Sequence, residues 1–88
     1  MKAYKINVFG RVHGVYFRAT TLQKANELGI KGTVKNLPDG SVQIITEGSS
    51  DKLELFIKWC HEGPVLAKVT SVEISDTVPV GFTGFEII

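Results

Sequence analysis

Lys31-Gly-Thr-Val-Lys-Asn-Leu-Pro-Asp-Gly-Ser-Val-Gln-Ile-Ile-Thr-Glu47 lies near the middle of the chain and decides its fold. Residues 31–37 and 41–47 both have the composition of β-strands, and Pro38-Asp39-Gly40 separates them. Proline presets φ for a turn, and an Asp-Gly pair tolerates the backbone angles that a tight turn requires. The stretch therefore predicts a β-hairpin.

A helix is predicted on each side of this hairpin, because apolar residues recur there at helical spacing. The first helix spans residues 19–28 and ends before Gly29, which stands where a left-handed C-terminal cap is expected. The second follows the capping residues 49–51 and ends near Gly63. The two apolar stripes consist of Leu22, Ala25 and Leu28, and of Leu53, Phe56, Ile57 and Cys60.

Strands are predicted at both ends of the chain. Residues 4–9 alternate between two faces, with Tyr4, Ile6 and Val8 on one of them, and this strand is expected to end at Gly10. Residues 68–78 alternate in the same way, and a short strand at 85–88 follows a segment that contains proline and glycine.

The resulting order is strand, helix, strand, strand, helix, strand, strand. Two β-α-β halves around a hairpin define the α+β, ferredoxin-like split βαβ sandwich, abbreviated βαββαβ. We expect a mainly antiparallel sheet of four or five strands, with both helices on one face. No repeat or linker interrupts the pattern, so residues 1–88 are expected to form a single domain.

Composition narrows the classes of function. The chain has 88 residues with 10 Lys and Arg against 9 Asp and Glu, a net charge of +1, and therefore no broad basic surface for nucleic acid or anionic membranes. Its only cysteine, Cys60, cannot form an intramolecular disulfide, and no Cys/His pair has zinc-site spacing. The first residues do not resemble a secretory leader, so we expect a cytoplasmic protein that begins near Met1.

Residues 10–18, between the first strand and the first helix, are the candidate site. Gly10 and Gly14 permit unusual backbone angles just before a helix N-terminus, where unpaired N–H groups and the positive end of the helix dipole favour an anion. The chain has eight lysines but only two arginines, Arg11 and Arg18, and both lie in this segment. The planar guanidinium can hold two oxygens of a phosphate at once. The alternative is that the glycines merely turn the chain and the arginines are solvated.

Two motifs favour the first interpretation, because they resemble the acylphosphatase family. Gly-Arg-Val-His-Gly-Val-Tyr-Phe-Arg at 10–18 is similar to the signature loop of that family, and residues 32–42 resemble its second motif, an asparagine strand followed by an Asp-Gly turn. Residues 28–30, 47–48 and 63–64 also match family positions, so the resemblance covers nearly the whole chain.

The resemblance implies hydrolysis of the carboxyl-phosphate anhydride of acyl phosphates, which gives a carboxylate and inorganic phosphate without metal or cofactor. It implies that Arg18 binds phosphate and that Asn36 orients the attacking water. It also implies a phosphate loop made by the backbone amides of His13, Gly14, Val15, Tyr16 and Phe17. The partners are then small molecules, with no nucleic acid or membrane, and we expect a monomer.

The sequence departs from the family pattern at three places. His13 stands where the family most often has glutamine, and Thr33 where it often has a bulky aromatic residue. The end of the chain, residues 85–88, only partly resembles the aromatic or basic ending of the family. If only the loop amides contact phosphate, the exchange of glutamine for His13 should matter little, whereas a ring that faces the pocket would add a pH dependence. We favour the first.

Other reactive side chains have structural explanations. Cys60 lies on the apolar stripe of the second helix and is expected in the core. His61 is expected near the carbonyls of the helix end, and Trp59 at the helix edge with Leu55. Tyr16 and Phe17 are expected to pack in the core or to line an acyl pocket rather than to stack on bases.

Two rival functions remain open at the level of sequence. The first is an anion-binding regulatory module that uses the same fold and loop without turnover, although binding alone would not require Asn36. The second is an RNA-binding or metal-binding ferredoxin-like domain, which the near-neutral charge and the single cysteine disfavour. The fold by itself does not choose among these functions.

Overall fold

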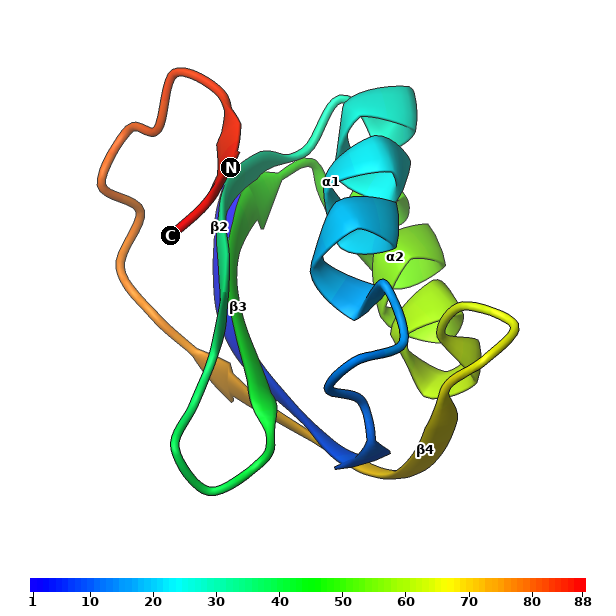
Figure 1. The fold of residues 1–88 in the computed structure, drawn as a ribbon. Helices are drawn as coiled ribbons and strands as arrows, with labels where there is room; N and C mark the ends of the chain where they lie inside the picture. The colour runs from blue at the N-terminus through cyan, green and yellow to red at the C-terminus, as the bar shows by residue number, and fades with distance from the viewer.

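The computed structural model describes residues 1–88 and has a five-stranded sheet with both helices on one face (Figure 1). The strands lie in the order β4-β1-β3-β2-β5, and every pair is antiparallel except β2 with β5. The predicted ferredoxin-like fold is confirmed. The elements are β1 (Lys2–Arg11), α1 (Phe17–Leu28), β2 (Lys31–Asn36), β3 (Val42–Gly48), α2 (Ser50–Glu62), β4 (Lys68–Asp76) and β5 (Phe85–Ile87).

The central hairpin forms as predicted. β2 and β3 pair in register from Lys31 opposite Glu47 to Asn36 opposite Val42. Asp39 fixes the turn, since its Oδ1 accepts hydrogen bonds from the backbone N–H and the hydroxyl of Ser41 at 2.9 and 2.5 Å. These two bonds lower the pKa of the Asp39 carboxyl. The turn thereby sets where β2 ends, which is at Asn36.

The core lies between the sheet and the two helices. In α2 the predicted stripe is buried except for Ile57, which is only partly buried. In α1 the fully buried face is instead Phe17, Thr21 and Ala25, and the predicted Leu22 and Leu28 pack at its margin. Thr21 can be buried because its hydroxyl donates to the Phe17 carbonyl at 2.7 Å. Neither helix is long and apolar enough to cross a bilayer.

β1 does not end at Gly10, as the sequence predicts, but continues to Arg11. Its register with β4 shifts between Phe9 and Gly10, and Gly10 has a φ of 127°. A side chain there is excluded, because a Cβ on Gly10 would lie 2.2 Å from the carbonyl oxygen of Lys68. Glycine therefore bulges the strand instead of ending it, and the bulge redirects the chain toward α1.

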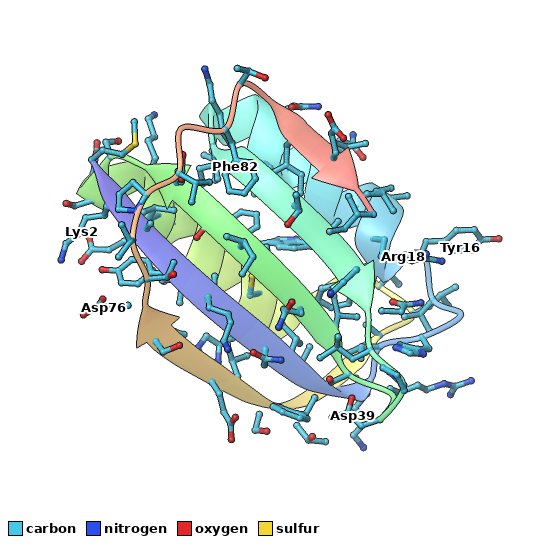
Figure 2. All side chains as sticks on the ribbon, turned by 90° about the vertical axis from the view of Figure 1, so that its left-hand side faces the viewer. Lys2, Tyr16, Arg18, Asp39, Asp76 and Phe82 are labelled. Carbon is cyan, nitrogen blue, oxygen red and sulfur yellow. The ribbon has the colours of Figure 1, made fainter.

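A long connection, residues 77–84, joins the two opposite edges of the sheet. It runs from β4 over the open face to β5, as Figure 2 shows between Asp76 and Phe82. The carboxylate of Glu47 on β3 holds it midway and accepts the backbone N–H groups of Val80, Gly81 and Phe82. Glu47 is only 3% exposed, so these bonds satisfy a buried charge.

This contact predicts an acid-sensitive fold. Burial of Glu47 is the largest influence and would raise its pKa, but the three backbone donors together outweigh it, so the pKa lies below the usual value of 4.5. The ionised form thus stabilises the fold above that value, and the stabilisation is lost as the pH falls through the lowered pKa. We expect Glu47→Gln to remove the contribution of the Glu47 charge to the pH dependence of the free energy of unfolding.

The measurement is the urea midpoint of unfolding at a series of pH values between 7 and 3. Glu47→Gln should unfold at lower urea than the parent at pH 7, and the gap should narrow as the pH falls below 4.5. The exposed Glu73→Gln is the matched control and should follow the parent curve. A gap that stays constant over the whole series would contradict the assignment to the Glu47 charge.

Candidate active site

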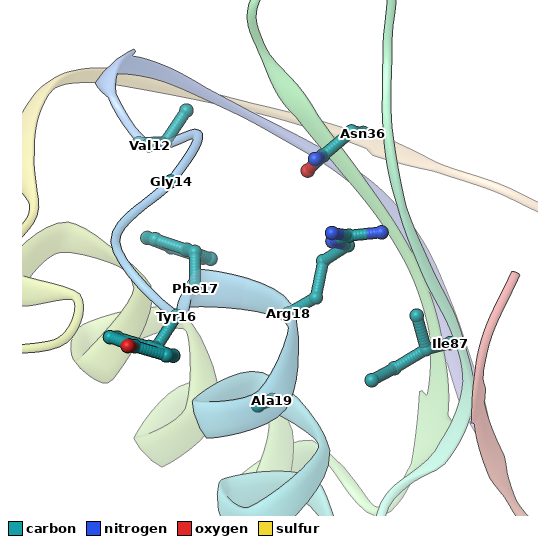
Figure 3. Close-up of a pocket in the computed structure, with 8 residues that line it drawn as sticks. All are labelled: Val12, Gly14, Tyr16, Phe17, Arg18, Ala19, Asn36 and Ile87. Atoms are coloured by element: carbon teal, nitrogen blue, oxygen red, sulfur yellow. The ribbon is translucent and has the colours of Figure 1, made fainter.

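A pocket of about 530 Å³ lies at the start of α1, between the loop after β1 and the end of β2 (Figure 3). It brings together both predicted catalytic residues, Arg18 from α1 and Asn36 from β2. The C-terminal strand β5 contributes Ile87. The complete lining is Val12, Gly14, Tyr16, Phe17, Arg18, Ala19, Asn36 and Ile87.

The loop reaches α1 through two left-handed backbone conformations. Gly14 has a φ of 69°, and Tyr16, the residue before α1, has a φ of 63° and a ψ of 25°. For a residue with a side chain this conformation costs about 1–2 kcal/mol. The Tyr16 carbonyl is fixed by two donors of Thr20, its backbone N–H at 3.0 Å and its hydroxyl at 2.8 Å. Left-handed residues in a tight loop are typical of the concave N–H arrangements that bind anions.

The backbone amides of this region have no acceptor within the protein. The first backbone amide after β1 that donates a hydrogen bond to another backbone group is that of Thr20, in the first turn of α1. The backbone amides of residues 13–19 therefore have no backbone acceptor. The first turn of α1 carries no acidic side chain, which leaves the positive end of the helix dipole unopposed. The pocket therefore offers a set of fixed N–H donors to an anion.

Arg18 adds a positively charged side chain to these fixed donors. Its side chain extends from the first turn of α1 toward β2, and its guanidinium lies on the same side of the pocket as the Asn36 carboxamide (Figure 3). The only ion pair of the protein joins Lys24 and Glu27, so no carboxylate neutralises Arg18. A guanidinium that is exposed and free of partners is available to an oxyanion.

Asn36 presents an unusual polar atom to the same pocket. Its Oδ1 is buried and is the only buried side-chain nitrogen or oxygen in the protein without a hydrogen-bond partner. Such an orphan acceptor is costly unless a ligand or water pairs with it. The residue lines the same pocket as Arg18, so this unsatisfied oxygen lies in the pocket wall.

His13 does not line the pocket, which agrees with the interpretation that its ring is not a phosphate ligand. Its Nε2–H donates to the carbonyl oxygen of Ser41 at 2.8 Å. The same oxygen accepts the backbone N–H of Leu37 at 2.9 Å, directly after Asn36. One carbonyl thus ties the loop before α1 to the strand end that carries Asn36.

This tie predicts different results for two substitutions of His13. His13→Ala removes the donor, so we expect the free energy of unfolding to fall by about 1 kcal/mol and turnover to fall by about three- to tenfold as the two halves of the site lose alignment. His13→Gln keeps an N–H donor at the same number of bonds from Cα as Nε2 of histidine and should recover most of both losses. Urea unfolding and steady-state kinetics of the three proteins measure this, and a glutamine variant as impaired as the alanine variant would refute it.

The remaining candidates lie in structural positions. Cys60 is fully buried, and burial raises the pKa of its thiol to about 12, so it is no nucleophile. His61 is exposed in the last turn of α2. The Trp59 ring packs against Phe17 and Phe56, with centroids 5.6 and 6.0 Å apart, and so joins the two helices.

Two features of the pocket were not predicted from the sequence, namely the contribution of Ile87 and the left-handed backbone conformation of Tyr16. Ile87 belongs to a three-residue strand after a Pro/Gly-containing segment, and nothing local indicates that it returns to the site. Tyr16 is 74% exposed, so of the two predicted roles it lines the pocket and does not pack in the core. The left-handed φ of Tyr16 has no sequence signal, because a bulky aromatic residue rarely adopts it.

Chemically, the pocket combines fixed backbone donors, one free guanidinium and one orphan carboxamide oxygen, with apolar side chains around them. Such a set suits a phosphoryl group together with a water molecule. A ferredoxin-like α+β sandwich with an anion site at the start of its first helix is the class of protein that the fold and the pocket define.

Comparisons with known proteins name the family. The profile of the acylphosphatase family matches residues 4–87. An acylphosphatase of Methylococcus capsulatus is 42% identical over 89 residues, which cover 100% of this chain and 97% of the relative. An acylphosphatase of Thermococcus kodakarensis is 43% identical over 83 residues, which cover 94% of this chain and 91% of the relative. The crystal structure of the Bacillus subtilis acylphosphatase has a TM-score of 0.97 at 35% identity and covers 100% of this chain and 99% of that one.

The chain belongs to the acylphosphatase family. The predicted family is thereby confirmed, and so is the prediction of an enzyme that is a hydrolase of the acylphosphatase kind.

Proposed function

We propose that this chain hydrolyses small acyl phosphates with the loop amides of residues 13–17 and Arg18 as phosphate ligands and Asn36 as the residue that orients water. The observation that carries the proposal is the orphan Oδ1 of Asn36 in the pocket that also contains the free guanidinium of Arg18. An anion site alone has no use for a buried acceptor, whereas a water-dependent reaction does.

In this reaction the oxygen of a water molecule attacks phosphorus while the bond from phosphorus to the acyl oxygen breaks. The carboxylate leaves with the bonding electron pair, and the water proton passes to a phosphate oxygen. A carboxylate is a good leaving group, so no strong general acid is needed. Positioning and electrostatic stabilisation of the transferred group can then supply most of the rate.

Each proposed residue has one task in this scheme. The amides of residues 13–17 and the end of the α1 dipole hold the nonreacting phosphate oxygens, and Arg18 neutralises the negative charge that develops on them. Oδ1 of Asn36 accepts a hydrogen bond from the attacking water. A neutral carboxamide cannot remove a proton at neutral pH, so Asn36 orients the water and does not act as a base.

The test is the loss of the ultraviolet absorbance of benzoyl phosphate in the presence of EDTA. We expect rapid hydrolysis that added inorganic phosphate inhibits competitively. A folded protein that binds phosphate but leaves benzoyl phosphate intact would favour the rival regulatory module over the enzyme.

We further propose that residues 1–88 act as one domain, as a monomer, in the cytoplasm, and without nucleic acid or membrane as a partner. The near-neutral net charge of +1 supports the absence of a polyanionic partner. The single, fully buried cysteine is compatible with a reducing compartment.

A further inference from the structure

The pocket divides into a polar part and an apolar part, and few of its apolar side chains can touch a ligand. Val12 and Phe17 are 1% and 2% exposed, because they face the core. Tyr16 and Ile87 are 74% and 41% exposed. Figure 3 shows Ile87 beside the Arg18 side chain, whereas Tyr16 lies on the other side of the start of α1. Ile87 is therefore the exposed large apolar side chain that stands next to the proposed phosphate ligand.

The substrate also has two parts. An acyl phosphate carries a charged phosphoryl group, which suits the loop amides and Arg18, and an acyl group, which is mostly carbon. With the phosphoryl group held at Arg18, the acyl group needs an apolar surface adjacent to that residue. The exposed carbons of Ile87 provide one.

The position of Ile87 depends on a short strand at the end of the chain. β5 has three residues and pairs only with β2, where Ile87 lies opposite Val34. Backbone bonds from Gly32 N–H to Gly84 and from Ile88 N–H to Val34 fasten its two ends, both at 2.9 Å. A strand of this length at a chain terminus frays readily unless something else restrains it.

The restraint is the contact between Glu47 and the connection that precedes β5. Glu47 accepts the N–H of Phe82 at 2.9 Å and that of Gly81 at 3.2 Å, in addition to the N–H of Val80. Only two residues separate Phe82 from the start of β5. Because β3 is the middle strand of the sheet and pairs on both sides, this carboxylate fixes the connection to the centre of the sheet.

We propose that Ile87 is the side chain against which the acyl group of the substrate packs, and that Glu47 positions it by holding residues 77–84 across the sheet. This inference rests on the proposed function, since it concerns the other half of the same substrate. The preference of the enzyme among acyl groups is then set by β5, while phosphate recognition is set by the loop.

The experiment compares benzoyl phosphate, which has a large acyl group, with acetyl phosphate, which has a small one. The readouts are the ratio of kcat/KM for the two substrates and the inhibition constant of inorganic phosphate. Ile87→Ala should lower the benzoyl-to-acetyl ratio by about three- to tenfold, less than a fully enclosed pocket gives because the wall is open on one side. Ile87→Val should have a smaller effect in the same direction, and phosphate inhibition should be retained in both variants.

Ile88→Ala is the matched control, because Ile88 is 62% exposed, does not line the pocket, and contributes its backbone N–H to β2. The benzoyl-to-acetyl ratio of kcat/KM in Ile88→Ala should equal that of the parent. An unchanged ratio in Ile87→Ala, or an equal fall in Ile88→Ala, would overturn the assignment of Ile87.

Glu47→Gln tests the positioning role. It replaces one of the two carboxylate oxygens by an NH2 group that cannot accept from the backbone N–H groups of residues 80–82, and it should lower the same ratio while phosphate inhibition persists. The double variant with Ile87→Ala should show no further fall, since Glu47 acts on selectivity through Ile87. Additive effects, or loss of phosphate inhibition in Glu47→Gln, would overturn the positioning role. Failure of the parent to hydrolyse either substrate would instead overturn the proposed function.

Discussion

Arg18→Gln is expected to reduce turnover of benzoyl phosphate by about a thousandfold or more and to abolish inhibition by inorganic phosphate. The guanidinium is the one cation that lines the pocket, and no carboxylate competes for it. Glutamine keeps an N–H donor but lacks the charge and the forked pair of donors. The phosphate would therefore lose its charged ligand in both the ground state and the transition state.

The other arginine supplies a matched control for this substitution. Arg11 is exposed at the end of β1 and does not line the pocket, so Arg11→Gln changes the net charge equally at a nearby position. We expect it to retain turnover and phosphate inhibition. An Arg18→Gln protein with the phosphate affinity of the parent would remove Arg18 as the binding group.

Asn36→Ala is expected to lower kcat by about a hundredfold while phosphate inhibition remains. The carboxamide oxygen would contact the attacking water and not the phosphoryl group, so its loss should affect the chemical step more than binding. Steady-state kinetics with phosphate as an inhibitor separate the two effects. Asn26→Ala, on the exposed side of α1, serves as the control and should resemble the parent.

Stability offers a second measurement on the same variant. Oδ1 of Asn36 has no partner within the protein, so alanine removes an unsatisfied buried acceptor rather than a hydrogen bond. We therefore expect the free energy of unfolding of Asn36→Ala to be no lower than that of the parent, although activity falls. A fall in both activity and the free energy of unfolding would indicate that Asn36 has a structural role that the orphan oxygen does not explain.

The parts of the fold that could be predicted from the sequence are those that local chemistry determines. The Pro-Asp-Gly turn predicts the hairpin because Asp39 bonds to Ser41, two residues away. The loop from Gly10 to Arg18 could be identified for the same reason, since glycines, arginines and a helix start follow one another in the sequence. Arg18 and Asn36 were both predicted, and the structure places them in one pocket.

The remaining features depend on contacts between distant residues or on backbone angles. Glu47 meets residues 80–82 over a separation of 33 to 35 positions, and no periodicity indicates that pairing. Ile87 reaches the pocket only because β5 adds to the far edge of the sheet. The buried face of α1 was misassigned because Thr21 is polar by composition and satisfied only in the folded helix.

The parallel pairing of β5 with β2 also bears on how the protein behaves at high concentration. β2 would otherwise be an edge strand whose free N–H and C=O groups could pair with a strand of another molecule. By occupying Gly32 N–H and the Val34 carbonyl, β5 covers this edge of β2 and leaves in its place an outer edge of only three residues. A protein clipped before Gly84 would expose β2 as an edge strand, so we expect it to associate more readily at high concentration and to lose its acyl preference.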